Sequence, residues 1–208
     1  MFSKAIVRTP GKSLINGLTD SSHLGVPDYS RAIIQHQAYI EALKFCGLEV
    51  TVLEPCEDFP DSTFVEDVAL ITPSCAIMTR PGAESRRGEV EHISSLLVSQ
   101  FKYLETIDAP GTIEAGDIMM VGSHFYIGLS DRTNIQGANQ LIALLEKYGY
   151  TGSTVELKDV LHLKTGLSYL ENNILAICGE FKSDPIFAEF EQIEIPESES
   201  YAANCIWV

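Results

Sequence analysis

The chain has 208 residues, of which 45% are hydrophobic and 21% charged, and its formal net charge is −15 at pH 7. This is a globular composition, and its acidity argues against nucleic acid and anionic membranes as partners, because both need a basic face. No apolar run could span a bilayer and the N-terminus lacks the apolar core of a signal peptide, so we expect a cytoplasmic protein. The five cysteines contain no CxxC pair, which predicts neither structural disulfides nor a metal site.

The N-terminal quarter is predicted to contain two strands and one helix. The strands are Lys4–Thr9 and Leu48–Leu53, and the helix is Tyr29–Cys46, which Gly47 ends. Between the first strand and the helix lies a long polar loop, Ser13–Asp28, whose length is typical of a functional or a disordered segment and whose glycines would allow it to act as a lid.

From Val68 onward a unit of β-hairpin, helix and strand recurs with a period of about fifty residues. Its predicted hairpin strands are Val68–Ile71 with Cys75–Thr79, Ile118–Val121 with Phe125–Leu129, and Ser168–Leu170 with Ile174–Cys178. Its predicted helices are Glu89–Phe101, Ile135–Tyr148 capped by Asn134, and a short one opened by Asp184 and Pro185. Further extended segments are predicted at Tyr103–Ile107, Thr154–Leu157, Val160–Leu163, Phe190–Ile195 and Tyr201–Val208.

Acidic residues stand just before these hairpins, at Asp61, Glu66, Asp67 and Glu114. Because equivalent loops of a repeat gather at one end of its axis, these carboxylates are expected to converge, and a cluster of carboxylates suits a guanidinium. The alternative, that each caps a turn or faces solvent, remains open for every one of them and for Asp117. His162 holds the place in the third unit that Glu114 holds in the second, although a histidine between leucines is more often structural.

Five segments resemble motifs of the dimethylarginine dimethylaminohydrolase family, especially its bacterial type. They are Phe59–Asp67, Arg80–Arg87, Ala109–Asp117, Leu161–Gly166 and Tyr201–Val208, and they follow the family's order along essentially the whole chain. The resemblance implies the pentein fold, a five-bladed α/β propeller, of which a single domain over residues 1–208 would contain about four blades. This agrees with the repeat.

The resemblance also implies roles for single residues. Glu114 and His162 match members of the catalytic set. Asp61, Glu66 and Asp67 match residues around the substrate guanidinium, and Leu18 matches a lid residue. Arg86 and Arg132 match receptors for the substrate α-carboxylate, a role for which arginine forks are suited, although surface salt bridges are their commoner use.

The expected reaction converts N-omega-methylated arginine, either asymmetric dimethylarginine or monomethylarginine, to L-citrulline and a methylamine through a covalent thiol intermediate, without a metal or other cofactor. The family's nucleophilic cysteine stands near its C-terminus, in the last blade, and Cys205 does not match it; we expect Cys205 to be buried and unreactive. We therefore expect a natural protein that continues past Val208, and a 208-residue form that is inactive.

Two other functions remain open. One is an arginine deiminase-like hydrolase acting on unmethylated guanidines, and the other is a non-catalytic module that binds guanidines. The expected partner is in each case a small molecule, and the resemblance allows a homodimer.

Overall fold

The computed structural model describes residues 2–19 and 21–208. Its contacts fall into two compact units, one formed by the residues up to Val65 together with Val208, and the other by Glu66–Trp207. The expectation of a single domain stays a prediction. In the described residues, none of the helices is both long and apolar enough to cross a membrane.

The N-terminal unit is a parallel strand pair joined through a helix. Strands β1 (Lys4–Arg8) and β2 (Glu49–Leu53) pair over their full length, and α1 (Tyr29–Phe45) connects them. Asp28 caps α1 by accepting a hydrogen bond from the Arg31 N–H. The buried side chains of this unit are Val7, Ile40, Leu43 and Leu48, against which Val208 packs. The predicted loop 13–28, apart from residue 20, contains two short 3-10 helices, η1 (Lys12–Asn16) and η2 (Ser22–Leu24).

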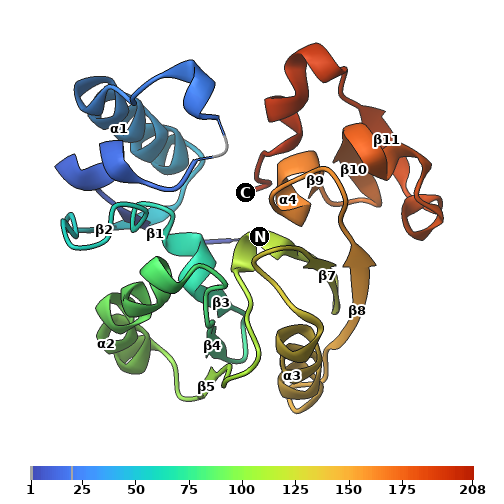
Figure 1. Ribbon diagram of the computed structural model, residues 1–208. Helices are drawn as coiled ribbons and strands as arrows, with labels where there is room; N and C mark the ends of the chain where they lie inside the picture. Colours follow the sequence, from blue (N-terminus) through green and yellow to red (C-terminus); the bar gives the residue numbers. More distant parts are fainter. Residues whose placement is uncertain (1, 20) are drawn as a thin grey trace. The chain divides into compact units, whose positions relative to one another are not determined.

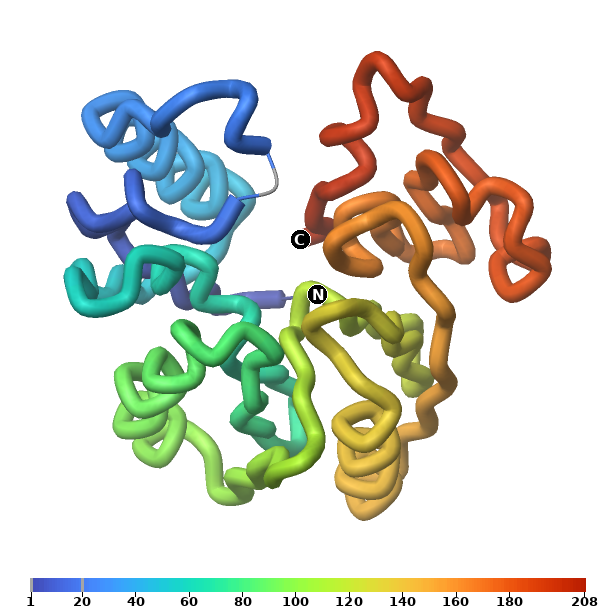
Figure 2. The backbone as a smooth tube through the Cα atoms, in the orientation of Figure 1, coloured from blue at the N-terminus to red at the C-terminus, as the bar shows by residue number. Residues whose placement is uncertain are grey.

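The second unit contains three sheets of one design, and they follow one another along the chain from green to red (Figure 2). In the first sheet, β3 (Ala69–Ile71) pairs antiparallel with β4 (Ala76–Met78). The chain then passes through α2 (Glu91–Gln100) and returns as β5 (Leu104–Thr106), which is parallel to β4 (Figure 1). A helical crossover of this kind is what two parallel strands require.

The second sheet repeats this order. Strands β6 (Ile118–Val121) and β7 (His124–Leu129) form a hairpin, α3 (Ile135–Glu146) follows, and β8 (Thr151–Glu156) returns parallel to β7. Asn134 caps α3, as predicted, by accepting from the Gly137 N–H at 2.8 Å.

The third sheet has the same strand order with a reduced crossover. The hairpin strands are β9 (Leu167–Tyr169) and β10 (Ile174–Ile177), and β11 (Glu191–Glu194) is parallel to β10. The predicted helix after Asp184 is only two short 3-10 helices, η6 (Gly179–Ser183) and η7 (Pro185–Phe187), although Asp184 does cap the second by accepting from the Ile186 N–H.

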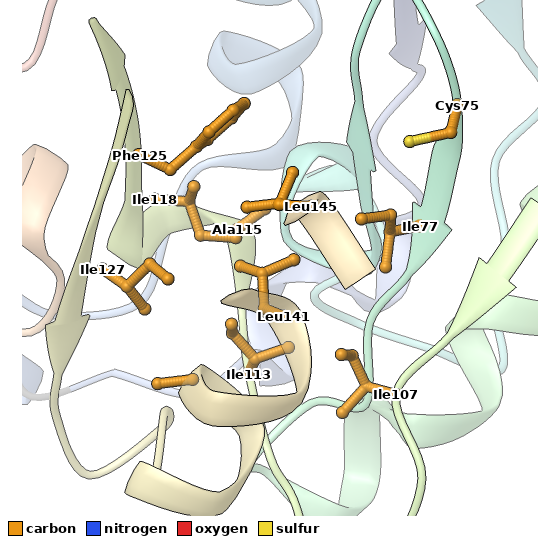
Figure 3. Packing of buried hydrophobic residues seen from close by; sticks show 11 residues of the cluster. Cys75, Ile77, Ile107, Ile113, Ala115, Ile118, Phe125, Ile127, Leu141 and Leu145 are labelled. Atoms are coloured by element: carbon orange, nitrogen blue, oxygen red, sulfur yellow. The ribbon is translucent and has the colours of Figure 1, made fainter. Parts of the chain in front are cut away.

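Apolar packing joins the first two sheets. Leu141 and Leu145 of α3 lie between Phe125 and Ile127 of β7 on one side and side chains of the first sheet on the other (Figure 3). A second cluster, which contains Leu167, Leu175, Ile177, Phe181 and Phe187, includes Met119 and Val155 of the middle sheet. The middle sheet therefore shares a core with each of its neighbours.

A single short helical turn precedes each of the three hairpins. These turns are η3 (Val65–Val68), η5 (Ala115–Asp117) and α4 (Leu163–Gly166). The period of about fifty residues is thus the spacing of a turn, hairpin, crossover and strand, and the predicted repeat is confirmed.

Two predicted strands are wrong. Val160–Leu163 is not a strand, because Leu163 already begins α4 and its N–H donates to the Asp117 carboxylate. Within Tyr201–Val208, the first residues end the 3-10 helix η8 (Glu197–Ala203) and the rest belong to no strand. Cys205 is exposed, so its predicted burial is wrong as well.

Candidate functional site

The turns before the hairpins bring three of the predicted residues of the second unit together, and a fourth, Arg86, joins them from another helix. Asp67 lies in the turn η3, Glu114 directly precedes η5, and His162 directly precedes α4. One carboxylate oxygen of Asp67, one of Glu114 and one ring nitrogen of His162 lie within 4.8 Å of one another. Arg86, from the 3-10 helix η4 (Glu84–Val90), contacts both carboxylates. Residues about fifty positions apart therefore form one centre, as the repeat predicted.

Arg86 is the cation of this centre. Its Nη1 lies 2.7 Å from Asp67 Oδ2 and 3.6 Å from Glu114 Oε2, and its Nε and Nη2 donate to the two carboxylate oxygens of Glu89 at 3.1 and 2.9 Å. Burial opposes the charge of the guanidinium, but the Glu89 and Asp67 carboxylates outweigh it and raise the pKa of Arg86. These contacts show Arg86 holding carboxylates of its own protein, and its predicted role as receptor for a substrate carboxylate stays a prediction.

Glu114 is only 1% exposed. Its Oε1 accepts from the Ala83 N–H at 3.3 Å, and its Oε2 lies 3.5 Å from His162 Nε2. Burial raises the pKa of the Glu114 carboxyl and the nearby Asp67 charge adds to this, while Arg86, Ala83 and His162 act in the opposite direction. A further cation beside this carboxylate would stabilise its charged form.

His162 lies between two carboxylates. Its Nε2 faces Glu114, and its Nδ1 lies 3.3 Å from Asp117 Oδ1. Burial disfavours the imidazolium, but Asp117, Asp67 and Glu114 outweigh it and raise the pKa of His162. The ring is thus suited to carry a proton into a reaction.

Gly116 allows the close packing of this centre. A Cβ atom at this position would lie 2.9 Å from Asp67 Oδ1, nearer than real Cβ contacts, and 3.0 Å from the His162 ring, which is tighter than most of them. The Gly116 N–H donates to the same Asp67 oxygen at 2.9 Å. A side chain at position 116 would therefore separate Asp67 from His162.

The other predicted residues lie outside these contacts. Glu66 is exposed and pairs with Lys164, two residues after His162. Arg132 is half-buried, and within the described part of the chain its guanidinium makes no ion pair. In the N-terminal unit, the buried Asp61 carboxylate accepts from the N–H of the half-exposed Leu18 at 3.0 and 3.2 Å and so fixes the loop that carries it.

Sequence reasoning missed Glu89, the bidentate partner of Arg86, and the contact between Asp117 and His162. The pairing of Arg86 with Glu89 has a signal in the sequence, since the two stand three residues apart, at a spacing that allows side-chain contact on a helix. For Asp117 the signal is its position in the repeat, which matches that of Asp67 one period earlier.

Asp67, Glu114 and His162 offer atoms with the chemistry of metal ligands. The guanidinium of Arg86 already brings a positive charge into contact with both carboxylates. We assign no metal to the centre.

The raised pKa of His162 predicts a dependence of stability on pH. The ordinary value is 6.5, so from there upward to the folded pKa the native state keeps a proton that the unfolded state has lost. The free energy of unfolding should fall as pH rises through this window, and His162→Gln should remove that part of the fall. Urea unfolding at steps from about pH 6 to pH 9 measures it.

The matched control is His23→Gln, because His23 is exposed. This variant should show the same fall in the free energy of unfolding with pH as the wild type. If the free energy of unfolding of His162→Gln fell in parallel with that of the wild type, the assignment of this fall to His162 would be contradicted.

The chain was compared with known proteins. The family model described as "N,N dimethylarginine dimethylhydrolase, eukaryotic" matches residues 27–184. An N(G),N(G)-dimethylarginine dimethylaminohydrolase from Pseudomonas aeruginosa is 62% identical over 209 residues, covering 100% of this chain and 82% of the relative. One from Streptomyces coelicolor is 37% identical over 167 residues, covering 80% of this chain and 65% of that protein.

Solved structures agree with these matches. The Pseudomonas aeruginosa enzyme, as a cysteine-to-serine mutant complexed with citrulline, has a TM-score of 0.97 and 61% identity, covering 100% of this chain and 82% of that one. The N-terminal domain of ArgZ, a cyanobacterial arginine dihydrolase, has a TM-score of 0.87 at 17% identity, covering 98% of this chain and 80% of that one, and shares the α/β pentein fold. The chain belongs to the dimethylarginine dimethylaminohydrolase family and is a hydrolase of the dimethylargininase type.

Proposed function

We propose that the centre of Asp67, Glu114 and His162 binds the guanidinium of N-omega-methylated arginine, and that the full reaction releases L-citrulline and a methylamine. The observation that carries this proposal is an excess of buried negative charge. Four carboxylates that are at most 7% exposed, those of Asp67, Glu89, Glu114 and Asp117, surround one arginine and one histidine. A planar cation rich in N–H donors would satisfy such a site.

The chemistry follows from the positions of His162 and Glu114. A cysteine thiolate adds to the guanidinium carbon, and the amine leaves readily only when it is protonated. His162, whose pKa is raised, can donate that proton and later accept one from the water that releases citrulline. Glu114 accepts hydrogen bonds from the guanidinium nitrogens as the carbon becomes tetrahedral.

The thiol that attacks is not assigned to any of the five cysteines of this chain. Cys56, Cys75 and Cys178 are buried, and burial raises the pKa of the Cys75 thiol. Cys46 and Cys205 are exposed. In the described residues, no cysteine forms a hydrogen bond with Asp67, Glu114 or His162.

The substrate's other groups need partners as well. Arg132 and Arg86 have the planar donor set that recognises an α-carboxylate, and we propose both as its receptors, although Arg86 also holds Asp67 and Glu89. Leu18, whose backbone Asp61 holds, is proposed as the residue that covers the substrate's alkyl chain. Glu66 and Asp61 are proposed to contact the guanidinium end of the substrate.

A homodimer and a cytoplasmic location also stay predictions.

The reaction is tested by product analysis. The protein encoded by the complete reading frame, given asymmetric dimethylarginine, should release citrulline and dimethylamine in equal amounts. The polypeptide of residues 1–208 should turn over about a millionfold more slowly or not at all, since the covalent route depends on a single thiol.

Ammonia from arginine, with no dimethylamine from the methylated substrate, would contradict the proposal and favour a deiminase-like enzyme. Cys205→Ser in the 208-residue polypeptide is the control for the thiol. Citrulline formation that this substitution abolishes would make Cys205 the nucleophile and overturn its exclusion.

Arg132→Gln tests the carboxylate receptor. Loss of a charge-assisted pair worth about 1.5–3 kcal/mol should weaken the binding of asymmetric dimethylarginine by about tenfold or more. It should leave the affinity for the decarboxylated analogue unchanged, because that analogue has no carboxylate to lose. Titration calorimetry measures both, with Arg31→Gln, at an exposed position of α1, as the matched control. Equal losses for the two ligands would contradict a receptor role.

A further inference from the structure

Asp117 is a carboxylate with no exposed surface at the end of the turn η5. Three hydrogen-bond donors point at it. The hydroxyls of Ser130 and Thr133 donate to Oδ2 at 2.7 and 2.6 Å, and the Leu163 N–H donates to Oδ1 at 3.0 Å. These bonds fix the carboxylate and leave it a role only as an acceptor.

Asp117 has one basic neighbour. Within residues 2–19 and 21–208, the only basic side chain in ion-pair contact with its carboxylate is His162, with Nδ1 3.3 Å from Oδ1. Nδ1 is buried, and in that same part of the chain no group is aligned for a hydrogen bond with it. A proton on Nδ1 would be directed at Asp117 after a small rotation of the ring.

We propose that Asp117 is a positioning residue, which holds His162 in the tautomer with its proton on Nδ1 and so leaves Nε2 to face Glu114 and the reacting group. The bond from the Leu163 N–H to Asp117 positions the backbone beside His162 at the same time. The catalytic meaning of this arrangement rests on the function proposed above, but the arrangement itself does not. Buried groups that orient a histidine in this way set which nitrogen is free to react.

The opposite tautomer is disfavoured by the charges around the ring. A proton on Nε2 would leave the Nδ1 lone pair facing the Asp117 carboxylate, in a buried place where this repulsion is not screened. With the proton on Nδ1, the Nε2 lone pair faces Glu114, whose negative charge is offset by the Arg86 guanidinium at 3.6 Å and by the Ala83 N–H.

The other charged groups near the ring do not replace Asp117. Asp67 adds negative charge, and Arg86 is in contact with Asp67 and Glu114. Lys164, on the turn that follows His162, is paired with Glu66. None of them is within ion-pair distance of Nδ1 among the residues that the structure describes.

Asp117 also reaches the loop that carries Arg132. Ser130 and Thr133 flank this arginine, and the Ser130 hydroxyl accepts from its backbone N–H at 3.0 Å. One carboxylate thus fixes the backbone on both sides of the centre, next to His162 and next to Arg132.

The test is ¹⁵N NMR of the histidine imidazoles in the 208-residue chain, with His162→Gln used to identify the signals of His162. In the wild type at a pH above the titration of His162, the ¹⁵N shifts should show Nδ1 protonated and Nε2 unprotonated. In Asp117→Asn, the pKa of His162 should fall and the two tautomers should become mixed. Asp108→Asn, which removes the same charge from an exposed position, should change neither.

An Nε2-protonated His162 in the wild type would overturn the proposal, and so would an Asp117→Asn protein with the wild-type tautomer and pKa. The wild-type spectrum decides even if the substituted protein does not fold. These spectra need no substrate, so a failure of the proposed reaction and a failure of this inference are separate results.

Discussion

Two buried carboxylates link each repeat of the second unit to the next. Asp67 accepts a hydrogen bond from the Gly116 N–H, and Asp117 accepts one from the Leu163 N–H. In the third repeat, the hydroxyl of Ser168 in β9 donates to the Ala203 carbonyl and accepts from the Cys205 N–H. The turns that carry Glu114 and His162 are therefore held by side chains of the preceding repeat, and the geometry of the centre depends on these links.

Burying these carboxylates is costly unless they are paired, and in the described part of the chain they share few basic side chains. Arg86 is shared among Asp67, Glu89 and Glu114, and His162 is shared between Glu114 and Asp117. Burial and then the Asp67 charge raise the pKa of Glu114, while the carboxylates of Asp117, Asp67 and Glu114 raise the pKa of His162 against the effect of burial. A guanidinium ligand, as proposed, would bring a further positive charge to these carboxylates. The same groups would then account both for the binding of a cation and for the supply of a proton to its leaving group.

The repeat was predictable from sequence because hairpins and amphipathic helices leave periodic patterns, and it implied that Glu114 and His162 would meet. The wrong predictions came from segments whose conformation is decided by distant contacts. Alternation around His162 is typical of a strand, yet the bond between Asp117 and Leu163 begins a helical turn there. The apolar sequence after Tyr201 indicates a strand, but its start completes a 3-10 helix that Ser168 holds. The burial of the Arg86 side chain among carboxylates also depends on distant contacts, and the sequence alone does not show it.

The central claim is that the buried charge of Glu114 recognises a cationic guanidinium. Titration calorimetry of asymmetric dimethylarginine against the wild type and Glu114→Gln tests it most directly, because the substitution removes the charge and keeps the shape. The account predicts binding that is about tenfold or more weaker, the equivalent of one lost charge-assisted hydrogen bond. The exposed control Glu91→Gln should bind as the wild type does. Equal affinities of the wild type and Glu114→Gln, with both proteins folded, would contradict the account.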